Sequence, residues 1–196
     1  AESYRAIEKM TIPATSPLLQ EAQTNYLRSL RLFQEVDKQL KDQPLSGFQV
    51  PYQLSNDPYI AEAMSYAASA QDDYYEAIVR WHASVVLELN GLDALSQGNL
   101  TLEQWHHYPF NIKNSAVAKA MHEHQIFASY TPQDVTAVLS AMIETGRTAT
   151  LGLETVDEAI VLLHETNAVR NGDFFQYISA FEEEVMPQLP FFAPSH

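Results

Sequence analysis

Residues 57–91, DPYIAEAMSYAASAQDDYYEAIVRWHASVVLELNG, decide the fold because they read as one long helix. Asp57 can cap its first turn, Pro58 occupies the first helical position, where a missing N–H costs nothing, and Gly91 can end it in a left-handed conformation. Unbroken, this helix would span about 50 Å. Its main seam is formed by Ile60, Met64, Ala67, Gln71, Tyr74, Ile78, Trp81 and Val85, and further apolar residues lie on the neighbouring faces. A helix that is apolar on most sides is an interior helix, so we expect the central helix of an α-helical bundle.

Further helices are predicted on both sides of this stretch. A second long helix over residues 17–41 starts at Ser16 and Pro17 and is the natural antiparallel partner of the first. A short helix is expected within residues 1–10. After Gly91 the predicted helices are short: one opened by the capping box Thr101–Gln104, then 115–128, 132–146, one from the capping box Thr155–Glu158 to Val169, and 174–185.

The prediction is an all-α, single-domain helical bundle over residues 1–196. The change near Gly91 suggests a subdivision into a long-helix half, 1–91, and a short-helix half, 92–196.

The charge of the chain limits its partners. Its 196 residues include 25 Asp and Glu against 11 Lys and Arg, a net charge of −14, and after Lys119 the only Lys or Arg residues are Arg147 and Arg170. Such a surface repels phosphate backbones, so direct nucleic-acid binding is not expected. No apolar run approaches the length of a membrane-spanning helix. The absence of cysteine, with a start at Ala1 that is compatible with a removed leader, favours an exported (periplasmic or secreted) protein over a cytoplasmic one.

Histidines on apolar stripes are candidate metal ligands. His82 lies on the stripe of 57–91, and His124 lies on that of 115–128. A buried imidazole needs a hydrogen bond or a ligand, so the two could bind a metal ion or haem iron. Glu103 and His106 form one Glu-x-x-His step, although di-iron bundles use that step twice with further carboxylates. A tyrosine hydroxyl or a carbonyl could equally satisfy a core histidine, so the leading expectation is no cofactor.

Aromatic residues on the long helix are candidates for a ligand pocket. Tyr74, Tyr75 and Trp81, together with His82, could line a site for a small apolar or aromatic ligand between helices. The same spacing is also typical of an ordinary core. The sequence contains no nucleophile elbow, phosphate-binding loop or dinucleotide fingerprint, so no residue is predicted to be catalytic.

Three functional hypotheses follow. The first is a non-catalytic helical module that binds a protein partner or a small ligand in a sensor, inhibitor or immunity-type role. The second is a metal- or haem-dependent helical-bundle oxidoreductase that uses the inward histidines. The third is an acidic nucleic-acid mimic that blocks a nucleic-acid-binding protein.

Overall fold

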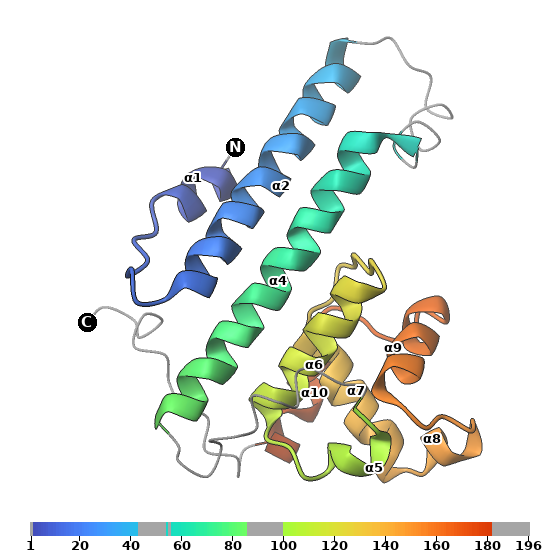
Figure 1. Cartoon of the computed structure of the whole chain (residues 1–196). Coiled ribbons are helices and arrows are strands. Elements are labelled where there is room, and N and C mark those ends of the chain that lie inside the picture. The colour runs from blue at the N-terminus through green and yellow to red at the C-terminus, as the bar shows by residue number, and fades with distance from the viewer. Residues whose placement is uncertain (1, 43–53, 55, 86–99, 182–196) are drawn as a thin grey trace. The chain divides into compact units, whose positions relative to one another are not determined.

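The fold of the described residues is all-α, as predicted (Figure 1). The computed structural model describes residues 2–42, 54, 56–85 and 100–181. In chain order the helices are α1 (Glu2–Glu8), α2 (Pro17–Asp42), α4 (Pro58–Val85), α5 (Leu102–Trp105), α6 (Phe110–Glu123), α7 (Pro132–Glu144), α8 (Arg147–Thr150), α9 (Val156–Glu165) and α10 (Phe174–Tyr177), followed by the 3-10 helix η3 (Ile178–Phe181). Apart from an isolated antiparallel bridge between Thr101 and Thr155, the residues described contain no strand. None of their helices is both long and apolar enough to cross a membrane.

The contacts divide the chain into two compact units, Ala1–Tyr74 (unit 1) and Tyr75–His196 (unit 2). The division falls inside α4, upstream of the position near Gly91 that the sequence pattern suggests. The predicted helix end at Gly91, residues 43–53 and 55 of the connection between the two long predicted helices, and the last predicted helix beyond Phe181 lie outside the described residues.

The two long N-terminal helices, α2 and α4, are confirmed. Asp57 caps α4 as predicted, because its Oδ1 accepts hydrogen bonds from the backbone N–H groups of Tyr59 and Ile60 at 2.8 and 3.4 Å. The buried stripe of α4 differs from the predicted seam. Ala63 and Ala70 are fully buried, whereas Val85, assigned to the seam, is 55% exposed.

Unit 1 pairs α2 with the first part of α4 (Figure 1). The side-chain amide of Asn25 donates to Asp73 Oδ2 at 3.1 Å, and the Arg28 guanidinium lies 5.5 Å from the centre of the Tyr66 ring. Arg28 follows Asn25 on α2, whereas its partner Tyr66 precedes Asp73 on α4, so the two helices are antiparallel, as predicted. The two fully buried alanines of α4, Ala63 and Ala70, are seven residues apart, a spacing typical of helices that cross at a shallow angle.

Tyr26 makes the stability of unit 1 depend on pH in the alkaline range. Burial, and then the nearby Tyr74 and Asp73, raise the pKa of Tyr26 from 10.0 to about 12. Between these two pH values the unfolded chain loses the phenolic proton while the folded chain retains it. The free energy of unfolding is therefore expected to fall as pH rises through this window, by up to about 1.4 kcal/mol per pH unit.

The Tyr26→Phe variant tests this dependence, since it has no phenolic proton to lose. Its free energy of unfolding, measured by urea denaturation across the same pH range, should fall less steeply than that of the wild type. Tyr59 is 44% exposed, so Tyr59→Phe is the matched control and should keep the wild-type slope. Equal slopes for the wild type and Tyr26→Phe would contradict the assignment.

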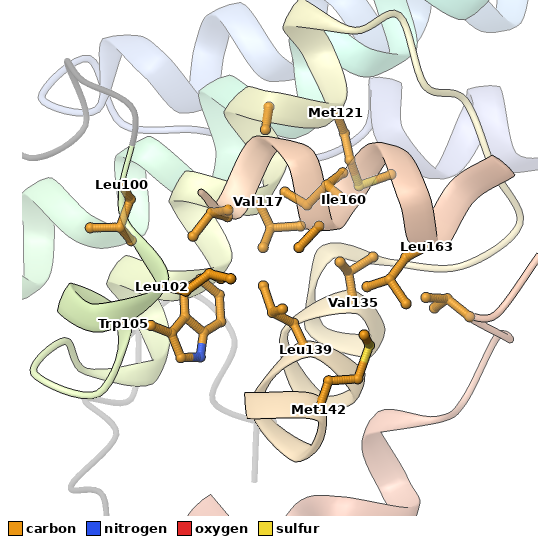
Figure 2. Close-up of a cluster of buried hydrophobic side chains, with 14 of the residues drawn as sticks. Leu100, Leu102, Trp105, Val117, Met121, Val135, Leu139, Met142, Ile160 and Leu163 are labelled. Atoms are coloured by element: carbon orange, nitrogen blue, oxygen red, sulfur yellow. The ribbon is translucent and has the colours of Figure 1, made fainter. Parts of the chain in front are cut away.

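Unit 2 is built around a hydrophobic core to which α5, α6, α7 and α9 contribute (Figure 2). Its most buried large side chains are Trp105, Val117, Met121, Leu139 and Ile160. The predicted capping boxes at Thr101 and Thr155 are confirmed and open α5 and α9. The two helix starts lie side by side, because Leu102 N donates to Glu154 O at 3.0 Å and Val156 N donates to Leu100 O at 2.9 Å.

Several helix boundaries in unit 2 differ from the prediction, most of all those of α6 and the end of α9. The helix expected over 115–128 is α6, which begins at Phe110 directly after Pro109 and ends at Glu123. It ends there because Gln125 adopts a left-handed φ of 53° and Ile126 N donates to Met121 O at 2.7 Å, which closes a Schellman motif. The helix expected to reach Val169 is α9, which ends at Glu165 for the same reason, with left-handed Asn167 in the equivalent position.

The last predicted helix begins at Phe174 as expected, but it tightens after one turn. Residues 174–177 form α10, and residues 178–181 form η3. The rings of Phe174 and Phe181 pack against Phe110, with centroids 5.1 and 4.5 Å apart. This aromatic cluster fixes the chain after α9 against the start of α6.

Candidate ligand-binding cleft

A cleft of about 600 Å³ opens in unit 2 between α7, α8, α9 and α10. Ligand pockets commonly measure about 300–1,000 Å³, so a small organic molecule fits in this space. The apolar lining consists of Val138, Met142, Leu151, Leu162, Leu163 and Ala168, together with Tyr177. The polar and charged lining includes Arg147, Asn167, Arg170, Asp173 and Gln176.

The floor of the cleft is continuous with the core of unit 2. Met142 and Leu163 belong to the core cluster and also line the cleft. In Figure 2 they lie on the far side of the cluster from Leu100 and Trp105. They are only 8% and 2% exposed, so the packing of the core holds the floor in place.

The polar side of the cleft is formed where α7 and α9 end. Gly146 follows α7 with a φ of 69°, and Asn167 follows α9 with a φ of 50°. At the end of α9, Ala168 N donates to Leu163 O at 3.0 Å and completes the Schellman motif. Left-handed residues turn the chain away from each helix axis, and the segments that follow bring Arg147 and Arg170 to the same cleft.

The two arginines of the cleft are available for a ligand. Both are exposed, and neither guanidinium has a hydrogen bond or an ion pair with another residue within the part of the chain that the structure describes. They do not cap the helix ends beside them either. The hydroxyls of Thr145 and Thr166 do so, by donating to carbonyl oxygens one turn back at 2.7 and 2.6 Å.

Asp173 is the acidic residue of the lining, and its carboxylate is already engaged. Its Oδ2 accepts from Arg170 N at 2.8 Å, and its Oδ1 accepts from the Gln176 side-chain amide at 3.3 Å. The turn that carries it is fixed from the other side by Asp134, whose Oδ1 accepts from Gly172 N at 3.1 Å and from Phe174 N at 3.0 Å. With two guanidinium groups and one carboxylate, the lining carries one net positive formal charge.

The four residues predicted to line an aromatic pocket are divided between the two units. Tyr74 is the last residue of unit 1, where burial raises its pKa, whereas Tyr75, Trp81 and His82 belong to unit 2. Tyr75 and His82 are buried and Trp81 is half-buried. His82 Nδ1 lies 3.4 Å from the side-chain amide of Asn111, which gives this core histidine a polar neighbour. None of the four lines the cleft.

His82 and His124 are not brought together in unit 2. His82 contacts Asn111, in the first turn of α6, whereas His124 is the C-terminal cap of α6. The helix between those positions is about 20 Å long. At its own end, His124 Nε2 lies 3.9 Å from Asp157 Oδ2. The structure therefore places His82 and His124 near opposite ends of α6.

Glu103 and His106, the Glu-x-x-His pair, lie on α5 and at its C-terminal cap, and both are exposed. Across residues 2–42, 54, 56–85 and 100–181, no group of three or more His, Asp or Glu side chains is arranged to hold a metal ion. Metal or haem binding by His82, His124, Glu103 or His106 stays a prediction without a ligand set among these residues.

The cleft is not among the predicted sites, although the sequence carries a signal for it. Arg147 and Arg170 are the only Lys or Arg residues after Lys119, in a chain of net charge −14. Each closely follows the end of a predicted helix. Two isolated cations at comparable positions in the sequence are this signal, but whether they line one cleft depends on the packing of α7 against α9.

Similarity to known proteins does not assign a function to this chain. No protein-family model, curated protein or solved structure matches it. The function is therefore inferred from the chemistry of the cleft.

Proposed function

We propose that this protein is a non-catalytic binding module that holds a small organic ligand in the cleft of unit 2. The observation that carries the proposal is the cleft of about 600 Å³, with an apolar floor and polar groups at its side. Small-molecule sites commonly combine a mainly apolar lining with a few polar groups that orient the ligand.

The rigidity of the lining supports the proposal. Its floor residues Met142 and Leu163 belong to the core, and the turn at Asp173 is held by hydrogen bonds to backbone N–H groups. A pre-formed site loses less conformational entropy on binding than a site that must be ordered by its ligand. The cleft is therefore suited to binding without a large rearrangement.

Two eight-carbon probes, 1-octanol and octanoate, test the proposal in an NMR titration of the ¹⁵N-labelled full chain. At least one probe is expected to shift the amide signals of Asn167 and Ala168 in a saturable way. Val138→Trp, which fills a half-buried lining position, should abolish these shifts. Val161 is also half-buried on a helix of unit 2 but does not line the cleft, so Val161→Trp is the matched control.

Two outcomes of this titration would overturn the proposal. If neither probe shifts these amides, or if Val138→Trp binds as well as the wild type does, the cleft is not a ligand site.

A further inference from the structure

We infer that the cleft selects amphipathic organic monoanions, with a carboxylate held by Arg147 and Arg170 and an apolar body on the floor formed by Val138, Met142 and Leu163. This inference rests on the proposed function and adds the chemical class of the ligand.

The placement of positive charge carries the inference. The chain has a net charge of −14, and the two arginines are its only Lys or Arg residues after Lys119. They are separated in sequence by α8 and α9, yet both line the same cleft. The last two Lys or Arg residues of the chain therefore both face one cleft with an apolar floor.

The hydrogen bonding of the two guanidinium groups also supports the inference. Neither is paired with another described residue, and Thr145 and Thr166 perform the helix capping that a nearby arginine could otherwise provide. A guanidinium presents a planar fork of N–H donors that matches a carboxylate in a bidentate way. Their hydrogen-bonding capacity is therefore available to an anion.

The remaining lining groups favour a single negative charge on the ligand. Asp173 accepts hydrogen bonds from Arg170 N and Gln176, so it is already engaged, but it still lowers the positive charge of the site. One net positive charge balances one carboxylate. A second charge on the ligand would face Asp173 and the acidic remainder of the protein without compensation.

The apolar floor makes a long hydrocarbon or aromatic body part of the recognition. Met142 and Leu163 are core residues with little exposed surface of their own, whereas Val138 is half-buried and Leu151 is 53% exposed, so these two supply most of the apolar surface that a ligand would cover. Burying that surface under an apolar body is favourable. The carboxylate alone should therefore bind much more weakly than an amphipathic acid.

Isothermal titration calorimetry of the full chain with octanoate, 1-octanol, octylammonium and acetate tests the inference. Octanoate is expected to bind the wild type at least ten-fold more tightly than 1-octanol does, because charge-assisted hydrogen bonds are stronger than neutral ones. Octylammonium and acetate should bind more weakly than octanoate. Phosphate should not compete with octanoate at equal concentration.

The double variant Arg147→Gln/Arg170→Gln should lose at least ten-fold in octanoate affinity while its affinity for 1-octanol stays unchanged. Retained octanol binding also shows that the variant is folded. Arg5→Gln/Arg31→Gln removes two positive charges from exposed positions of unit 1 and is the matched control. It should bind octanoate like the wild type.

The outcomes separate this inference from the proposed function. Equal affinities for octanoate and 1-octanol, or unchanged octanoate affinity in the Arg147→Gln/Arg170→Gln variant, would overturn the inference and leave the cleft as a ligand site. If neither octanoate nor 1-octanol binds, the proposed function fails together with the inference.

Discussion

Replacement of Trp105 by alanine is expected to destabilise unit 2 by about 3–5 kcal/mol, the cost typical of truncating a fully buried tryptophan. Trp105 is 1% exposed and is the largest fully buried side chain of the core in Figure 2. Its indole N–H donates to Ser140 Oγ at 3.0 Å, and the Lys113 ammonium lies 5.8 Å from the centre of its ring. Truncation would leave a cavity and remove both polar contacts. Urea denaturation followed by circular dichroism measures the loss.

Trp105→Phe separates the ring from its hydrogen bond. It keeps most of the apolar volume, so it should cost clearly less than Trp105→Ala. Trp81, the other tryptophan, is only half-buried, so Trp81→Ala should also be milder. A loss below about 1 kcal/mol for Trp105→Ala would mean that this core can collapse around the cavity.

Helix starts were predicted from the sequence more accurately than helix ends. Asp57, Thr101 and Thr155 mark starts because a side chain of the right type at the cap position satisfies free backbone N–H groups locally. The ends of α6 and α9 depend on Gln125 and Asn167 in a left-handed conformation. Neither is a glycine, so composition did not reveal these ends.

Sites were harder to predict than helices because they depend on packing between helices. Apolar spacing put His82 and His124 on inward stripes, and His82 is indeed buried. His124 instead becomes the cap of a helix that ends earlier than expected. The cleft requires α7, α8, α9 and α10 to meet, and no local pattern in the sequence specifies that meeting. Patterns within single helices therefore predicted which residues are buried, but they did not predict the cleft, which several helices form together.

The second large effect is expected from Asp134→Ala, which should destabilise unit 2 by about 3–5 kcal/mol by leaving buried donors without an acceptor. Asp134 is 2% exposed. Its Oδ2 accepts from Thr131 N at 2.8 Å and from Thr131 Oγ1 at 2.9 Å, and its Oδ1 accepts from Gly172 N and Phe174 N. One carboxylate thus caps α7 and fixes the turn before α10. Urea denaturation of the variant measures the cost.

Glu158 provides the matched comparison, since it occupies the same capping-box position at the start of α9. It accepts from Glu154 N and Thr155 N, and these hydrogen bonds lower its pKa, but it is exposed. Water can replace its hydrogen bonds, so Glu158→Ala should cost much less than Asp134→Ala. Equal losses for the two variants would show that burial does not set the cost.

Asp134 also connects the stability of unit 2 to ligand binding. The turn that it holds carries Arg170 and Asp173, two charged residues of the cleft lining. In Asp134→Asn the retained oxygen can still accept from Gly172 and Phe174, whereas the new amide N–H₂ faces donors at Thr131. This variant should therefore lose stability yet keep the turn, and at a temperature where it is folded it should bind octanoate like the wild type. Asp134→Ala, which frees the turn, should bind octanoate more weakly at the same folded population. Equal octanoate affinities in the two variants would mean that the cleft does not depend on the turn being fixed.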